Sequence, residues 1–148
     1  MVSADRVLRG RLGLMESNGY EIKPYADLVG ANLYATDLTF ANLKWANLYG
    51  ANLYAANLYG ANLYKADMTG ANLEGANLEG ANLYFTDLTD ANLTGACLID
   101  ANLYWADLTD ADLTRANLTG ANMLGPNQHS AKFIDAIMPD GDIWEPFK

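Results

Sequence analysis

Ala51-Asn52-Leu53-Tyr54-Ala55 is one copy of a five-residue pattern, Ala-(Asn/Asp)-Leu-x-x, that repeats twenty times in succession over residues 26–125. The third position, here called the centre, holds leucine in every copy except two, which hold methionine. The first position holds alanine, or threonine in two copies. A period of five matches neither the 3.6-residue period of an α-helix nor the two-residue alternation of a flat strand.

The repeat predicts a solenoid of short strand-like segments with a corner every five residues. The alanine and the centre are two residues apart, so both side chains point to the same face of a segment. Leucine then fills an axial core, and alanine lets the wall approach it closely. Each buried leucine contributes roughly 2 kcal/mol before the cost of ordering the chain is subtracted. Because every contact is with a neighbouring coil, both ends of the solenoid need caps.

The run of Ala-(Asn/Asp)-Leu-x-x copies resembles the pentapeptide-repeat family over about two thirds of the chain. The resemblance implies an all-β fold, a right-handed quadrilateral β-helix with four repeats per coil. Residues 26–125 would then form five regular coils, in which residue n stacks on residue n+20 at about 4.8 Å. The even Ala-Asn-Leu composition looks like that of the cyanobacterial members of undefined role.

Residues 1–25 break the repeat and are expected to form an N-terminal cap. Apolar residues lie roughly on one side of the segment after Ser3, which predicts a short helix that reaches Met15 and covers the first coil. A turn is expected at Ser17-Asn18-Gly19. The remaining residues, 22–25, lead the chain into the first coil.

Residues 126–148 keep the phase of five although most of the motif is lost. Small and large residues stay in register in three further steps: Ala131-Lys132-Phe133, Ala136-Ile137-Met138 and Gly141-Asp142-Ile143. The sequence therefore predicts a degraded sixth coil over about 126–145, with its weak side at Gln128, followed by a C-terminal cap. The alternative is a short helix capped by Ser130. Family members close with a sequence resembling residues 136–141, which favours the coil.

Residues twenty apart in the sequence should lie on the same side of the solenoid, so the outward residues fall into four sides. We call one the acidic side; its centres are Leu28, Leu48, Met68, Leu88 and Leu108. Its candidate residues are Asp27, Asp67, Asp87, Asp90, Asp107 and Asp110. We call another the aromatic side; its centres are Leu43, Leu63, Leu83, Leu103 and Met123. Its candidate interaction residues are Trp45, Tyr64, Lys65, Tyr84, Phe85, Tyr104 and Trp105.

Contiguous exposed aromatic residues usually mark a protein interface. The structural alternative is that the rings stack along the solenoid and shield its backbone. A homodimer through the aromatic side, or through Trp144 and Phe147 at the C-terminal end, satisfies both readings. In a sixth coil, Trp144 is expected to extend the aromatic row. The asparagines that precede the aromatic-side centres are expected to form a hydrogen-bonded ladder.

The corners provide a geometric test of the repeat. Nine of the residues two after a centre are glycine, where a type II turn needs a positive φ. On the aromatic side the same position holds bulkier residues, namely Trp45, Lys65, Phe85 and Trp105. Because such residues disfavour positive φ, the sequence predicts a different turn on this side.

Catalytic and metal-binding constellations are missing from the sequence. His129 is the only histidine and Cys97 the only cysteine, so neither has a partner for a metal site or a nucleophile–base pair. No glycine-rich phosphate loop is present. We therefore expect a protein that is not an enzyme and that needs no metal or cofactor.

Charge and hydropathy restrict the partners. The net charge of −9 argues against direct binding of nucleic acid. No apolar run is long enough to cross a membrane, and a single cysteine fits the cytoplasm. The expected function is that of a structural, protein-interaction module of undefined biological role, in which a rigid solenoid presents one side to a protein partner.

The alternative function is DNA mimicry. Quinolone-resistance members of the family bind DNA gyrase, a type II topoisomerase, by imitating duplex DNA. Six coils would span roughly 29 Å, over which a duplex carries about 17 negative charges, whereas residues 26–125 have a net charge of −8. That group also tends to have phenylalanine at the centre and loops between coils, and this chain has neither.

Overall fold

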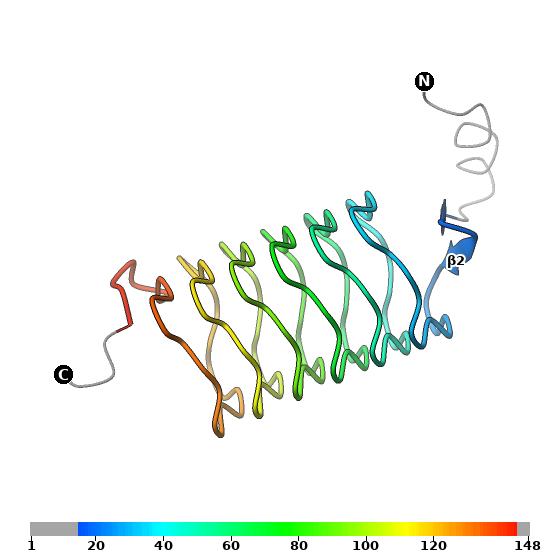
Figure 1. Cartoon of the computed structure of the whole chain (residues 1–148). Coiled ribbons are helices and arrows are strands. Elements are labelled where there is room, and N and C mark those ends of the chain that lie inside the picture. The colour runs from blue at the N-terminus through cyan, green and yellow to red at the C-terminus, as the bar shows by residue number, and fades with distance from the viewer. Residues whose placement is uncertain (1–14, 145–148) are drawn as a thin grey trace.

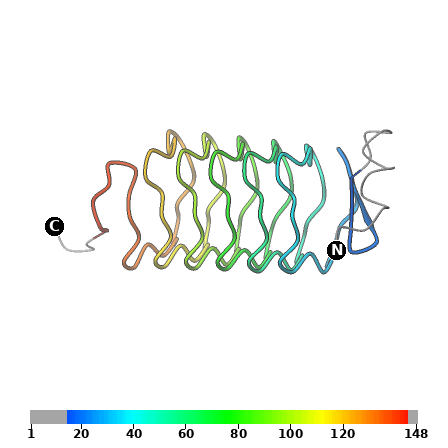
Figure 2. The ribbon, with the colours of Figure 1, turned by 90° about the horizontal axis from the view of Figure 1, so that it is seen from above.

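The computed structural model describes residues 15–144, and this part of the chain contains no helix and therefore none that could span a membrane. It is a four-sided solenoid whose coils follow one another from the N-terminal to the C-terminal end (Figure 1). Seen from above, the coils lie next to one another in a row along the long axis of the solenoid (Figure 2). The all-β solenoid predicted from the repeat is confirmed.

A β-hairpin precedes the first coil. Strand β1 (Met15–Ser17) pairs antiparallel with β2 (Tyr20–Ile22). The turn residues Asn18 and Gly19 have φ of 50° and 83°, as a type I′ turn requires, which confirms the expected turn. The helix predicted after Ser3 lies outside the described residues, except that Met15, its expected end, belongs to β1.

Main-chain hydrogen bonds between residues about twenty apart hold the coils together. The Leu73 N–H donates to the Asn92 carbonyl at 2.7 Å, and the Gly75 N–H donates to the Thr94 carbonyl at 3.0 Å. Within each corner a shorter bond closes the turn, as from the Ala76 N–H to the Leu73 carbonyl at 3.0 Å. Parallel bridges repeat this pairing on all four sides. The backbone is therefore satisfied by its neighbouring coils.

The core is a column of central side chains enclosed by alanines. All the centres between Leu33 and Leu118 are 0% exposed. Two threonines replace alanine in the wall, and each buried hydroxyl has an acceptor: Thr36 Oγ1 donates to the Leu33 carbonyl and Thr86 Oγ1 to that of Leu63, both at 2.8 Å. Within the described range no buried side-chain nitrogen or oxygen lacks a partner.

The corners contradict the prediction of a different turn on the aromatic side. The residue two after the centre has a positive φ whether or not it is glycine, for example 64° at Gly75 and 60° at Trp45. The reason lies in the inter-coil bonds: the Trp45 N–H must reach the carbonyl of Tyr64, at 2.9 Å. The left-handed conformation costs a non-glycine residue roughly 1–2 kcal/mol, and this bond offsets that cost.

The sixth coil exists on three of its four sides. Parallel bridges join its first three segments to the fifth coil: Asp107 to Asn127, Asp112 to Lys132, and Asn117 to Ile137. Phe133 fills the central position with 5% exposure, whereas Gln128 at the preceding centre is exposed, as expected for the weak side. The alternative of a helix after Ser130 is wrong, because this segment pairs as part of a coil.

The fourth side does not form, so the expectation that Trp144 extends the aromatic row is wrong. The chain reverses at Gly141, where φ is 88°, and Ile143 pairs antiparallel with Ile137. The Met138 N–H, which has no following coil to bond to, donates to the Asp142 carbonyl at 2.7 Å. This return segment carries Trp144 onto Phe133, at 5.5 Å between ring centroids.

Candidate interaction surface

The aromatic side carries two adjacent columns of rings. The corner column, at the residues two after each centre, includes the stacked pairs Tyr25–Trp45 (6.2 Å between centroids) and Phe85–Trp105 (6.5 Å). The tyrosine column, one residue earlier in each repeat, joins Tyr64, Tyr84 and Tyr104 at centroid separations of 5.5 and 5.3 Å. The columns also touch each other, most closely at Tyr84–Phe85, 4.5 Å. The structure therefore brings all the predicted rings of this side together.

Lys65 fills the gap in the corner column. Its Nζ lies 4.4 Å from the centroid of the Trp45 ring and 5.5 Å from that of Phe85. Tyr64 contributes a third ring at 5.5 Å. Such cation–π contacts contribute about 0.5–2 kcal/mol each, depending on how far the cation is desolvated. The ammonium is thus held in place by rings on both sides along the solenoid axis.

Stacking leaves the corner rings partly exposed. Trp45, Phe85 and Trp105 remain 43%, 43% and 52% exposed. The Phe85 and Trp105 planes differ by only 15°, so these two rings lie nearly parallel along the axis. The surface therefore presents partly exposed rings at the corner, together with half-buried tyrosines beside them.

The asparagines that precede the aromatic-side centres form a hydrogen-bonded ladder next to the tyrosine column. Asn82 Nδ2 donates to Asn62 Oδ1 at 3.4 Å, and the same bond recurs from Asn102 to Asn82 and from Asn122 to Asn102. Each asparagine Oδ1 also accepts the N–H two residues later, as from Tyr84 at 3.2 Å. The predicted ladder is confirmed, and it fixes the backbone that carries the rings.

Sequence reasoning missed the first ring of the corner column. Tyr25 is 73% exposed and stacks on Trp45 with an interplanar angle of 8°. The signal was present, because the two residues are twenty apart, but Tyr25 precedes the first complete repeat. At the other end, Trp105 lies over Gly125: a Cβ added there would be 3.2 Å from the indole. The corner column thus runs from Tyr25 to Trp105.

The acidic side is a column of carboxylates that bond locally. Asp67 Oδ1 accepts the Thr69 N–H at 3.0 Å, and Asp107 Oδ1 accepts both the N–H and the hydroxyl of Thr109. Burial acts to raise the pKa of Asp107, but hydrogen bonds from Thr109 and Asn127 outweigh it, and the pKa lies below its ordinary value. Within residues 15–144, no group of acidic residues, histidines or cysteines is arranged to hold a metal ion.

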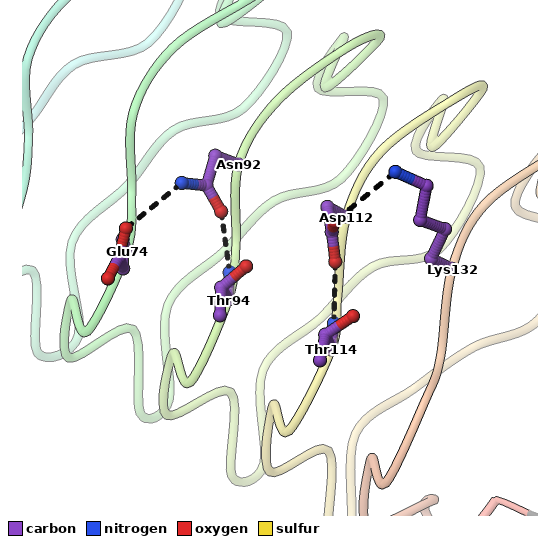
Figure 3. A network of polar contacts seen from close by, with 6 residues as sticks. All are labelled: Glu74, Asn92, Thr94, Asp112, Thr114 and Lys132. Carbon is purple, nitrogen blue, oxygen red and sulfur yellow. Dashed lines mark hydrogen bonds and ion pairs between the residues drawn. The ribbon is translucent and has the colours of Figure 1, made fainter.

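The side opposite the aromatic one, here called the Glu74 side, carries the stacked rings of Tyr34 and Tyr54 in its first two coils and polar contacts between coils further along (Figure 3). Asn92 Nδ2 donates to Glu74 Oε2 at 3.2 Å. One coil further on, Lys132 Nζ lies 3.4 Å from Asp112 Oδ2 and ties the sixth coil to the fifth. These contacts link each coil to the next.

The C-terminal candidates are separated from the aromatic side. Trp144 packs against Phe133, the last centre of the Glu74 side, and stays 40% exposed. Phe147 lies outside the described residues. His129 and Cys97 lie on different sides of the solenoid, and each is alone there among the described residues as a histidine or cysteine.

The fold and the surface define a repeat solenoid of the β-helix class. A family model described as "Pentapeptide repeats" matches residues 25–54, 56–95 and 96–125 in eight copies, so the chain belongs to the pentapeptide-repeat family. Members of this family adopt the right-handed quadrilateral β-helix, and they are in general structural, non-catalytic modules. No curated protein matches the chain.

Solved structures of the family resemble this one. HetL, a pentapeptide-repeat protein involved in heterocyst differentiation regulation from the cyanobacterium Nostoc sp. PCC 7120, is 37% identical with a TM-score of 0.65, and 81% of this chain is covered. AT2G44920 from the Arabidopsis thaliana thylakoid lumen is 31% identical (TM-score 0.58, 74% covered). This chain spans just under two thirds of their lengths, 65% and 66%. Rfr23 from the cyanobacterium Cyanothece 51142 is 26% identical (TM-score 0.55), with 95% of this chain and 98% of Rfr23 covered.

Proposed function

We propose that this protein is a non-catalytic interaction module that binds a protein partner through its aromatic side. The observation that carries the proposal is the strip of rings from Tyr25 to Trp105, stacked in two columns and still about half exposed at Trp45, Phe85 and Trp105. Rings on an ordered scaffold lose little side-chain entropy on binding, and aromatic residues are enriched in interfaces for this reason.

The scaffold suits this role because the core and the surface use different positions of the repeat. The centres and alanines are buried, whereas the two outward positions hold exposed or half-buried side chains. A partner can therefore be recognised through the outward rows without any change in the core. We place the protein in the cytoplasm, where the free thiol of Cys97 stays reduced.

An affinity capture with matched variants tests the proposal. Trp45, Tyr84 and Trp105 are changed to Ser in one bait, and the stacked pair Tyr34 and Tyr54 on the Glu74 side is changed to Ser in the control bait. The same captured protein should be lost with the first bait and retained with the second. Retention of every captured protein by the first bait would remove the aromatic side from consideration.

The partner could be a second copy of the chain, through the aromatic side or through Trp144. Sedimentation velocity of the full chain over a concentration series distinguishes these arrangements. A dimer that dissociates in the Trp45, Tyr84 and Trp105 variant belongs to the aromatic side, and one that dissociates only with Trp144→Ser belongs to the C-terminal end. A monomer at all concentrations leaves a different protein as the partner.

The acidic side supports a second proposal, binding of DNA gyrase by DNA mimicry. Asp67, Asp87 and Asp107 form one column, and Asp90 and Asp110 lie beside it. A supercoiling assay tests it: mimicry requires inhibition of gyrase by micromolar protein, lost when Asp87 and Asp107 become Asn. Unchanged supercoiling would eliminate this function.

A further inference from the structure

Charge is distributed unevenly around the solenoid. Over residues 26–125 the aromatic side carries no carboxylate and has two lysines, Lys44 and Lys65. The acidic side carries six carboxylates and no cation, and the remaining two sides are also net negative. In a chain of net charge −9, the aromatic side is therefore the side of these coils that repels an approaching anionic surface least.

The outward polar groups of the aromatic side are two lysine ammonium groups, which only donate hydrogen bonds, and tyrosine hydroxyls, which can donate as well as accept. The ion pairs within residues 15–144 are Lys23–Glu21 and Lys132–Asp112, so neither lysine of the aromatic side has a carboxylate partner in that range. The hydroxyls of Tyr64, Tyr84 and Tyr104 make no hydrogen bond to the described chain, and the asparagine amides beneath them are used in the ladder. A surface of unpaired O–H and ammonium donors is complementary to acceptors.

Lys65 is pre-organised among these donors. Its ammonium lies between the Trp45 and Phe85 rings, 4.4 and 5.5 Å from their centroids, and the whole residue is half-buried. A lysine on a free surface loses much rotamer entropy when it forms an ion pair. Here stacking has already restricted the side chain, so an arriving carboxylate gains a charge-assisted hydrogen bond at a lower entropic cost.

We propose that the surface covering the aromatic side is an acidic segment of a polypeptide, whose Asp or Glu carboxylates accept hydrogen bonds from Lys65 and from the tyrosine hydroxyls. This inference rests on the proposed function and specifies the chemistry of its partner. A polypeptide fits better than a nucleic acid because two lysines neutralise few phosphates, and the adjoining acidic side repels a chain charged at every unit more than one with a carboxylate at every second residue. A peptide can also place apolar side chains against the exposed rings.

Fluorescence anisotropy with defined probes tests the proposal on the full chain. The probes are a labelled 12-residue peptide of alternating Glu and Ala, its Gln–Ala counterpart, and a labelled 12-nucleotide oligothymidine, all at low salt. The variants are Lys65→Gln, Lys65→Arg, and Arg115→Gln as the matched control. Arg115 also lies two after a centre, with φ of 59°, but at a corner away from the aromatic side.

The Glu–Ala peptide should bind, and Lys65→Gln should weaken its binding roughly fivefold or more, with Lys65→Arg restoring it. Arg115→Gln should change binding by less than about twofold. Equal binding of the Gln–Ala peptide, absence of Glu–Ala binding, equal effects of Lys65→Gln and Arg115→Gln, or equal binding of the oligothymidine would each overturn the acidic-polypeptide inference.

A second readout separates this inference from the proposed function. In the affinity capture, Lys65→Gln is added as a further bait. Loss of the captured protein with the Trp45, Tyr84 and Trp105 variant, together with its full retention with Lys65→Gln, would leave the aromatic side as the interface and contradict an acidic partner. Loss with both baits, while Arg115→Gln retains the protein, is the result expected here.

Discussion

Leu73 in the third coil and Gln128 in the sixth occupy the same position of the repeat, yet one is 0% exposed and the other faces solvent. The third coil has a neighbour on each side, and the sixth has a neighbour on one. In a solenoid, the free energy of unfolding is approximately a sum of repeat and nearest-neighbour terms. A central side chain therefore makes its full contribution to stability only when a coil packs on each side of it. The comparison separates the positions that hold the fold from those that can vary.

The largest expected effect on stability comes from placing a charge in the middle of the column of buried central side chains. Leu73→Asp removes a fully buried side chain and leaves an unpaired carboxylate in the core, so we expect a loss of at least about 5 kcal/mol in the free energy of unfolding, enough to prevent folding. Gln128→Asp at the equivalent exposed centre should cost under about 0.5 kcal/mol. Circular dichroism during urea unfolding measures both, and similar losses at the two positions would contradict nearest-neighbour stabilisation.

A smaller and local effect is expected at the end of the solenoid. Phe133→Ala removes the ring that fills the sixth coil and supports Trp144, and should cost about 2 kcal/mol, below the usual 3–5 kcal/mol for a core phenylalanine because only one coil flanks it. Hydrogen exchange should then quicken at Leu108, Leu113 and Leu118, whose N–H groups donate to the sixth coil. Faster exchange at Leu73 as well would show that the coils unfold together.

The corners give an effect of about 1 kcal/mol in either direction. Gly75→Ala meets no atom within 4 Å, so its cost comes only from the positive φ of 64°. Ala55→Gly at the same position of the preceding coil, φ 53°, should stabilise by a similar amount because strain is relieved. Thermal unfolding of the two variants measures the pair, and a shift of both in the same direction would disprove strain as the cause.

The smallest effect is a pH dependence at the junction of the fifth and sixth coils. Partial burial acts to raise the pKa of Asp112, but hydrogen bonds from Thr114 and the Lys132 ammonium outweigh it, and the pKa lies below its ordinary value. A lowered folded-state pKa gives stability that is present above the unfolded-state pKa of 3.8 and is lost as the pH falls through the folded-state value.

The expected contribution of Asp112 is about 0.5 kcal/mol, because the pair with Lys132 is partly solvated. The free energy of unfolding, measured by urea titration between pH 6 and about pH 2.5, should fall less steeply for Asp112→Asn than for the unchanged chain. Arg115→Gln, in the same coil, serves as the control for a change of charge. Identical pH profiles of the chain and of Asp112→Asn would contradict the assignment.

The regular coils could be predicted from the sequence because one local rule repeats and every copy meets the same surroundings. The fourth side of the sixth coil could not be predicted in this way. Small and large residues stay in the five-residue register through Ile143, but no further coil exists for that segment to stack on. The unpaired Met138 N–H then finds its acceptor in a reversed strand, which moves Trp144 to another side. A similar limit applies to Trp45: a backbone bond to the next coil outweighs its preference against positive φ.

The candidate surface could be predicted because residues twenty apart stack in one column. This rule places Trp45 and Phe85 in one column with Lys65 between them. Two features did not follow from it. Tyr25 lies outside the complete repeats, and the hairpin of β1 and β2 was recognised only as a turn, although Asn18-Gly19 is the usual signal for a two-residue hairpin. Which side carries the function depends on outward residues that the core does not constrain.

Hydroxyl-radical footprinting of the full chain with its captured partner tests the central claim most directly. If the aromatic side is the interface, oxidation of Trp45, Phe85 and Trp105 should fall severalfold in the complex, while Tyr34 and Tyr54 on the Glu74 side stay unchanged. Unaltered oxidation of the three aromatic-side residues, with protection of Tyr34 and Tyr54 instead, would contradict it.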